Sequence, residues 1–121
     1  MNLPNDEWTW YDLKEFKTRQ INFKNGLKHG DFKVWKDNDL YLSGIFDEDK
    51  KSGTWKWHRT KKDLDSLVNY VNGEINGLYE AWYDNGVLSV KGSFESGIPT
   101  GKWEWFSENN TLDSTKTFKN L

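Results

Sequence analysis

A glycine followed two residues later by an aromatic residue recurs along the chain at a near-constant interval of about 24 residues. The copies begin at Gly30, Gly53, Gly77 and Gly101, and a related Asp-Glu-Trp sequence begins at Asp6, one period earlier. A fixed period of this length is typical of stacked supersecondary units that contact only their neighbours. The 121 residues are therefore expected to form one repeat domain, with units of approximately 6–29, 30–52, 53–76, 77–100 and 101–121.

The clearest unit, residues 77–100, has the pattern of a β-hairpin. Its sequence Asp84-Asn85-Gly86 predicts a tight turn, because Asn and Gly accept the positive φ angles of hairpin turns. Strand-forming residues precede this turn at 78–83 and follow it at 87–95. Alternation predicts that one face of the second strand carries Leu88, Val90, Gly92 and Phe94. Residues 96–101 are expected to interrupt the sheet, because Pro99 has no amide donor.

The first strand of each unit carries aromatic residues on both of its faces. One face is predicted to hold Trp8 and Trp10, Phe32 and Val34, Trp55 and Trp57, Tyr79 and Ala81, and Trp103 and Trp105. The opposite face is predicted to hold Tyr11, Trp35, His58, Trp82 and Phe106. Sequence does not decide which of the two faces is covered.

Five hairpins in succession predict an all-β fold, an elongated antiparallel meander of about ten strands in a single-layer or gently curled sheet. Residues 59–69 replace the usual turn with a charged segment, for which a longer loop and a short helix both remain open. The last segment places Lys116 and Lys119 on an expected edge strand, where lysine discourages edge-to-edge association.

Composition restricts the classes of function. The 17 basic and 19 acidic residues give a net charge of −2, so binding to a nucleic-acid backbone is not favoured. The chain has no cysteine, which excludes disulfides and thiolate metal sites. The amino terminus lacks the pattern of a signal peptide, and no apolar run is long enough to span a membrane. The expected location is therefore the cytoplasm.

The repeat resembles the MORN repeat in its bacterial variant form. The resemblance is best over residues 77–106, good over 30–53 and degenerate over 6–29 and 53–76. It is carried by the sequence Gly77-Leu-Tyr79, by Trp82-Tyr83 and Asn85-Gly86, by Gly92 and by Gly101-Lys-Trp103. The resemblance implies an elongated β-meander without catalytic residues. It also implies a role as an antitoxin or immunity protein, as for bacterial members of similar length, or as a scaffold or membrane-associated protein, as for eukaryotic members.

No residue pattern predicts an enzyme. His29 and His58 are the only histidines, and the period brings no catalytic or metal-ligating partner to either of them. The run Asp47-Glu48-Asp49 lacks the ligand spacing of a calcium loop and is interpreted as a solvated hairpin loop. We therefore predict no catalytic residue, no metal site and no cofactor.

The sequence is best interpreted as that of a module that binds a protein partner through one face of its sheet, with a cognate toxin as the candidate partner. The residues predicted to contact this partner are Tyr11, Trp35, Trp82 and Phe106, because exposed aromatic strips are rich in hot-spot residue types. Acidic loop residues are expected to steer a basic partner. The alternative is a peripheral scaffold that docks on membranes through exposed rings and Lys61 and Lys62. The oligomeric state is left open.

Overall fold

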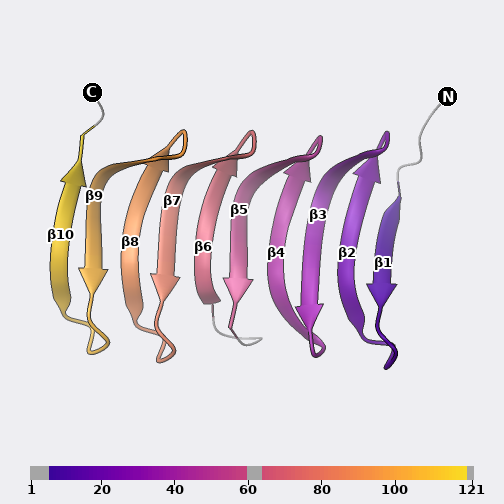
Figure 1. Cartoon of the computed structure of the whole chain (residues 1–121), viewed down its shortest axis with the longest axis horizontal. Coiled ribbons are helices and arrows are strands. Elements are labelled where there is room, and N and C mark those ends of the chain that lie inside the picture. Colours follow the sequence, from indigo (N-terminus) through magenta and orange to yellow (C-terminus); the bar gives the residue numbers. More distant parts are fainter. Residues whose placement is uncertain (1–5, 60–63, 120–121) are drawn as a thin grey trace.

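The computed structural model describes residues 6–59 and 64–119, which form a single ten-stranded sheet (Figure 1). Its strands are β1 (Glu7–Tyr11), β2 (Lys17–Lys24), β3 (Leu27–Lys36), β4 (Asp39–Asp47), β5 (Lys50–His58), β6 (Leu64–Val71), β7 (Glu74–Trp82), β8 (Leu88–Glu95), β9 (Ile98–Phe106) and β10 (Leu112–Phe118). Each strand pairs antiparallel with the next, and the sheet does not close into a barrel. The predicted all-β meander is confirmed.

The sheet has two different ends. At the lower end in Figure 1, which we call the loop end, the connections follow β1, β3, β5, β7 and β9. At the upper end, the turn end, the connections follow β2, β4, β6 and β8, and β1 begins and β10 ends on this side. Among the described residues no helix could cross a membrane.

The turn end is made of two-residue hairpin turns with both central residues at positive φ. These pairs are Asn25-Gly26, Glu48-Asp49, Asn72-Gly73 and Ser96-Gly97. The pattern is that of the type I′ turn, whose twist matches the twist of the strands that it joins. Within the loop end, Asp37-Asn38 makes a turn of the same kind.

The expected break at residues 96–101 is wrong, because Ser96-Gly97 is one of these turns and β9 continues through Pro99. Glu95 and Ile98 flank the two-residue turn as a cross-strand pair, so the next pair, Phe94 and Pro99, is of the non-hydrogen-bonded kind. The nitrogen of Pro99 therefore faces the β10 side. There the pairing ends at Gly101 and Phe118, so the missing amide donor interrupts no ladder.

Every pair of strands contains one irregularity in register. Where odd strands follow even ones, three residues of the odd strand oppose one residue, as Gly101, Lys102 and Trp103 oppose Gly92. The recurring glycine lies in this bulge and adopts positive φ, for example +97° at Gly30 and +100° at Gly77. The period that is visible in the sequence is thus a period of β-bulges.

A second kind of bulge corrects one predicted strand face. Ala81 pairs with Val90, but Trp82 pairs with Leu88, so Ser89 is an extra residue. Leu88 therefore lies on the face of Trp82 and not on the face of Val90, contrary to the strict alternation expected from the sequence. The hydroxyl of Ser89 donates a hydrogen bond to the carbonyl oxygen of Ala81 at 3.0 Å and stabilises the bulge.

For part of the segment 59–69, the structure decides between the two expected alternatives, a longer loop and a short helix. Leu64 begins β6, and Leu64–Val71 pairs along its length with β5 and β7. A helix over residues 64–69 is therefore wrong, and the remaining residues 60–63 lie outside the described part of the chain.

The core lies on one face of the sheet, which we call the core face. Of the residues that the structure describes, four hydrophobic ones are buried, and this face carries them: Phe46, Trp55, Val68 and Trp103. Two tryptophan rings lie flat on glycines of the preceding strand: a Cβ built on Gly44 would be 2.2 Å from the ring of Trp55, and one on Gly92 would be 2.1 Å from the ring of Trp103. The indole of Trp103 also donates a hydrogen bond to the carbonyl of Ser93 at 3.1 Å.

Each flat tryptophan ring also packs edge-to-face against a phenylalanine from the same neighbouring strand. The ring centroids of Phe46 and Trp55 are 5.1 Å apart at 86°, and those of Phe94 and Trp103 are 5.1 Å apart at 90°. Edge-to-face pairs of this kind stabilise a protein by about 0.5–1.5 kcal/mol beyond the area they bury. The aromatic rings of the core face therefore shield one another from solvent on a sheet that has no second layer.

The packing on the core face alternates from one hairpin to the next. Gly44 faces Trp55 and Gly92 faces Trp103, whereas Ile21 pairs with Phe32 and Val68 pairs with Tyr79. Thus, where the preceding strand has a glycine, the next strand has the large ring of tryptophan. Where the preceding strand has a branched aliphatic side chain, the next strand has the smaller ring of phenylalanine or tyrosine. Corresponding residues in this alternation, such as Gly44 and Gly92, are separated by two periods of the glycine motif. The structural repeat is therefore two hairpins, twice the period that the sequence displays.

Replacing Gly92 with valine is expected to lower the free energy of unfolding by about 2–4 kcal/mol. The new Cβ would overlap the ring of Trp103, and overpacking of this kind typically costs about 1–3 kcal/mol or more. Urea unfolding followed by tryptophan fluorescence measures the change. Lys91→Val is the matched control, because Lys91 is exposed on the opposite face and its replacement should change stability by less than about 0.5 kcal/mol. Equal stability of the two variants would contradict the proposed ring contact.

Candidate functional site

The face opposite the core face, which we call the polar face, is crossed by a row of cross-strand partners. The row consists of Thr9, Gln20, Lys33, Ser43, Lys56, Leu67, Glu80, Lys91, Glu104 and Thr115. Lys91 lies between Glu80 and Glu104, so oppositely charged residues are adjacent in this part of the row. Most of the polar face is therefore a solvated surface.

Aromatic residues return to the polar face at its loop end. The four residues predicted to contact a partner lie there, together with the imidazole that continues their series. We call this set the loop-end row: Tyr11, Trp35, His58, Trp82 and Phe106. They come from β1, β3, β5, β7 and β9, and each is the last or next-to-last residue of its strand. The prediction that they share one face agrees with the pairing of the sheet.

The structure adds leucines to this row, among them Leu88, which alternation in the sequence places on the other face. The bulges near the loop end pair Trp35 with Leu40 and Trp82 with Leu88. Similarly, His58 pairs with Leu64, Phe106 pairs with Leu112, and Tyr11 pairs with Lys17. Strict alternation in the sequence hides these leucines, because each bulge moves the residue that precedes its extra residue to the other face of the sheet.

The predicted contact residues form an extended line and not a compact cluster. Odd-numbered strands are about 9.6 Å apart, so Trp35 and Trp82 are separated by about 19 Å. Tyr11 is 58% exposed, whereas Trp35, Trp82 and Phe106 are only half-buried. The amine of Lys17 lies 5.5 Å from the centre of the Trp35 ring. The row is thus a strip of partly buried apolar side chains that crosses the strands at the loop end.

His58 lies at the centre of the loop-end row. Burial lowers the pKa of His58, and the nearby charge of Lys56 lowers it further. Its Nε2 atom is buried and has no hydrogen-bond partner among the described residues. A neutral imidazole therefore fits this position, where it acts as a ring between Trp35 and Trp82.

Arg59 fixes the central loops of the loop end. Its Nε atom lies 2.7 Å from a carboxylate oxygen of Asp84, and its guanidinium contacts the carboxylate of Asp65. It also donates a hydrogen bond to the carbonyl oxygen of Trp82 at 3.0 Å. These contacts connect the connection after β5 to the connection after β7 and hold the backbone of Trp82 in place.

Acidic residues predominate in the loops beside the row. Exposed carboxylates at this end belong to Asp12, Glu15, Asp37, Asp39, Asp84, Glu108 and Asp113. The described basic residues there are Lys14, Lys17, Lys36 and Arg59, and the charge of Arg59 is matched by Asp65 and Asp84. Lys61 and Lys62, which the membrane alternative invokes, lie outside the described residues. The described residues of the loop end therefore carry a net negative charge.

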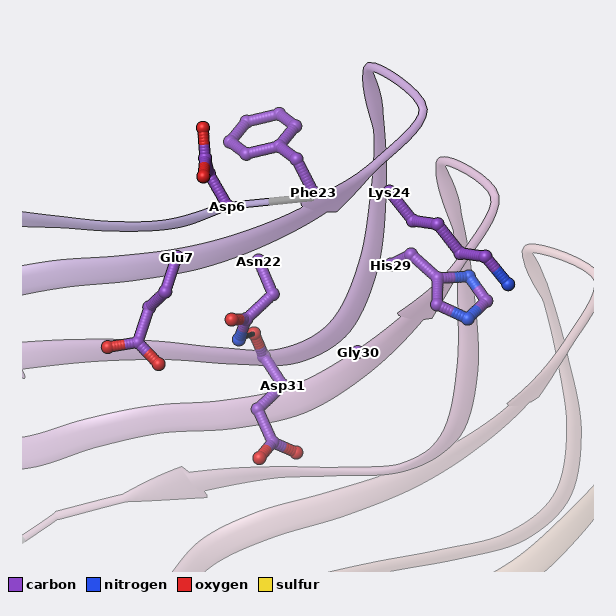
Figure 2. Close-up of a pocket in the computed structure, with 8 residues that line it drawn as sticks. All are labelled: Asp6, Glu7, Asn22, Phe23, Lys24, His29, Gly30 and Asp31. Carbon is purple, nitrogen blue, oxygen red and sulfur yellow. Dashed lines mark hydrogen bonds between the residues drawn. The ribbon is translucent and has the colours of Figure 1, made fainter. Parts of the chain in front are cut away.

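A depression of about 570 Å³ lies at the opposite corner of the sheet, near the turn end of β1 to β3 (Figure 2). Its polar side chains do not converge: the carboxylates of Glu7 and Asp31 lie apart from the imidazole of His29. His29 instead accepts a hydrogen bond from the backbone amide of Glu48 at 3.3 Å, and its Nδ1 atom is 3.5 Å from Asp47. This arrangement places no base beside a nucleophile.

Within residues 6–59 and 64–119, no group of three or more histidines or carboxylates is placed to hold a metal ion. Asp47 ends β4, and Glu48 and Asp49 form the turn that follows it, in agreement with the predicted hairpin loop. Asp49 accepts a hydrogen bond from the backbone amide of Lys28 at 2.7 Å, a contact that connects neighbouring turns. The predictions of no catalytic residue, no metal and no cofactor stay predictions.

Comparison of the chain with protein-family models, with curated proteins and with solved structures finds no match in any of the three.

Protonation of His58 is expected to destabilise the fold. Because its pKa is lower in the folded state than the ordinary value of 6.5, the unfolded chain binds the proton more readily. The stability contributed by the neutral ring is therefore present above pH 6.5 and is lost as the pH falls through 6.5 toward the folded pKa. Urea unfolding at pH 7.5 and 5.5 should show a larger loss for the natural protein than for His58→Phe. Equal losses would contradict this assignment.

Proposed function

We propose that this protein is a non-enzymatic binding module that recognises a basic protein partner through the loop-end row. The observation that carries this proposal is a line of partly buried rings and leucines across the strand pairs, bordered by acidic loops in the described part of the chain. Trp35 and Trp82 are the principal contact residues, and Tyr11 and Phe106 flank them.

The chemistry of the row supports this proposal. Tryptophan and tyrosine are enriched among residues that dominate binding energy, since a large ring buries much area at a small cost in side-chain entropy. The contact between Arg59 and the carbonyl of Trp82 holds that part of the row in place before a partner arrives. A line of rings about 40 Å long, from β1 to β9, suits an elongated protein surface.

The class of partner follows from the acidic loops. Carboxylates beside an apolar strip steer a basic protein toward the strip and penalise an acidic one. Together with the resemblance to bacterial MORN variant proteins, this property makes a basic toxin the partner class that we propose, with the protein as its antitoxin or immunity protein. The location in the cytoplasm is part of the same proposal.

The double variant Trp35→Ala, Trp82→Ala is expected to lower partner affinity at least about tenfold, because each substitution removes a central ring of the row. The partner is first identified by affinity capture from native lysate and mass spectrometry. Its dissociation constant is then measured by calorimetry for the natural protein and for the variant. Ile98→Ala, which removes an exposed apolar side chain at the turn end, is the matched control and should leave this affinity within twofold. An unchanged affinity for a folded double variant would contradict the site assignment.

Vesicle flotation distinguishes the membrane alternative. The protein should not co-float with anionic vesicles at low salt, because the acidic residues around the row repel anionic lipid. Co-flotation that is lost in Lys61→Ser, Lys62→Ser would replace the protein partner with a lipid surface.

Neutralising the two carboxylates of the β3–β4 turn is expected to slow association with the partner. Asp37→Asn, Asp39→Asn removes negative charge beside Trp35 without removing apolar area, so the association rate and its salt dependence should both fall, while the dissociation rate changes little. Stopped-flow fluorescence at low and at high salt measures the association rate. A faster association of this variant would contradict the proposal of a basic partner.

A further inference from the structure

Trp8 is the exposed member of a set of otherwise buried rings. Trp8, Trp55 and Trp103 occupy the same position of the repeat on the core face, but their exposed fractions are 54%, 1% and 6%. The difference has a simple cause: β4 and β8 cover Trp55 and Trp103, whereas β1 is the edge of the sheet. The ring of Trp8 therefore lacks, among the described residues, the strand that covers its equivalents.

The molecule itself shows what kind of strand covers such a ring. In β4 the covering residues are Leu42, Gly44 and Phe46, and in β8 they are Val90, Gly92 and Phe94. The glycine accepts the flat indole, and the phenylalanine contacts the same indole edge-on at 5.1 Å in both cases. The shared pattern is aliphatic-x-Gly-x-Phe.

The side chains of the β1 edge already have the geometry of the covered sites. The ring centroids of Trp8 and Trp10 are 6.2 Å apart at 31°, and those of Trp103 and Trp105 are 6.0 Å apart at 29°. Beside Trp8 lies an open apolar cavity of about 360 Å³, lined by Trp8, Trp10, Phe23 and Gly26. The cavity lies over β1 and β2, and the arrangement of Trp8 and Trp10 is already that of the covered pair Trp103 and Trp105.

The backbone of β1 also offers hydrogen bonds to an added strand. Asp6 and Phe23 exchange both of their backbone hydrogen bonds, at 3.1 and 2.8 Å. Because hydrogen-bonded pairs alternate with non-hydrogen-bonded ones, Trp8 and Trp10 also bond toward β2, and the amides and carbonyls of Glu7 and Thr9 face the open edge. Strand addition uses edges of this kind.

The β10 edge of a second copy of this chain is a poor occupant of the β1 edge. Its own open edge strand, β10, carries Lys116 at the position of Gly44 and Gly92. A side chain at this position collides with an indole that lies flat on the backbone, as the distances at Gly92 show. The lysine also holds its amine 4.8 Å from the centre of the Phe118 ring.

We propose that the β1 edge is a second binding site, which takes an extended segment of another protein by strand addition. The segment has the pattern aliphatic-x-Gly-x-Phe, with its glycine under the ring of Trp8 and its backbone paired to Glu7 and Thr9. This site lies on the core face and at the edge of the sheet, so it is independent of the loop-end row on the polar face.

The test is a titration of the isotope-labelled full chain with a synthetic peptide that has the sequence of residues 87–96, Val-Leu-Ser-Val-Lys-Gly-Ser-Phe-Glu-Ser. Saturable shifts of the Glu7 and Thr9 amide resonances, with slowed hydrogen exchange at both amides, are the expected result. The same peptide with valine in place of its glycine should bind at least about tenfold more weakly, because the valine would overlap the ring of Trp8.

Two protein variants distinguish this site from the loop-end row. Trp8→Ala should weaken binding of the glycine peptide at least about tenfold, whereas Trp82→Ala should leave it within twofold. The glycine and valine peptides compared on the natural protein give the same test without relying on the folding of a variant. Equal binding of both peptides, binding that maps to other strands, or no binding up to roughly 1 mM would overturn the proposal. Concentration-dependent self-association that Trp8→Ala abolishes, measured by light scattering, would also overturn it, because a second copy would then be the occupant of the β1 edge.

Discussion

The contact between an indole ring and a glycine of the neighbouring strand is the interaction on which this fold depends. A single sheet has no second layer to cover its apolar face, so its side chains must cover one another. Trp55 and Trp103 do so by lying flat where Gly44 and Gly92 have no Cβ, and each is closed at the side by a phenylalanine. The indole of Trp55 is also within hydrogen-bond distance of the carbonyls of Ile45 and Ser52, at 3.2 Å each. These contacts specify the register of the strands, since a shift by one residue would place a side chain under the ring.

Much of this fold could be predicted from the sequence, because alternation within a strand and recurrence of the glycine motif are both visible in a single chain. The order of the strands, the ring columns on both faces of the odd strands and the turn near Asn85 follow from these two periods. The errors come from bulges and from local turn geometry. The extra residue Ser89 moves Leu88 to the other face, and Ser96-Gly97 makes a tight turn where a break was expected before Pro99. Neither effect changes the composition of the strand, so neither leaves a clear signal in a single sequence.

The candidate site could be predicted only in outline. The columns that contain Trp35 and Trp82 are visible in the sequence, but their exposure depends on what covers each face, which periodicity does not specify. Alternation assigns Leu88 of the loop-end row to the wrong face, because the bulge at Ser89 is not visible in the sequence. The contact between Arg59 and Asp84 joins the loops of two different hairpins, and it depends on side-chain reach and not on pattern. The two faces consequently have different properties: the core face carries the buried rings, and the loop end of the polar face carries partly exposed apolar side chains.

The alternation of ring sizes restricts how a chain of this kind can change its length. Deleting the single hairpin of β7 and β8 would bring Val68 beside Trp103, where the distances at Gly92 leave no room for a side chain. Deleting the hairpin of β5 and β6 would leave Gly44 beside Tyr79, a smaller ring than the one that now fills this space. Only the gain or loss of two hairpins together keeps every ring on a matching neighbour. Duplication during evolution, and extension by design, should therefore proceed by pairs of hairpins and not by single ones.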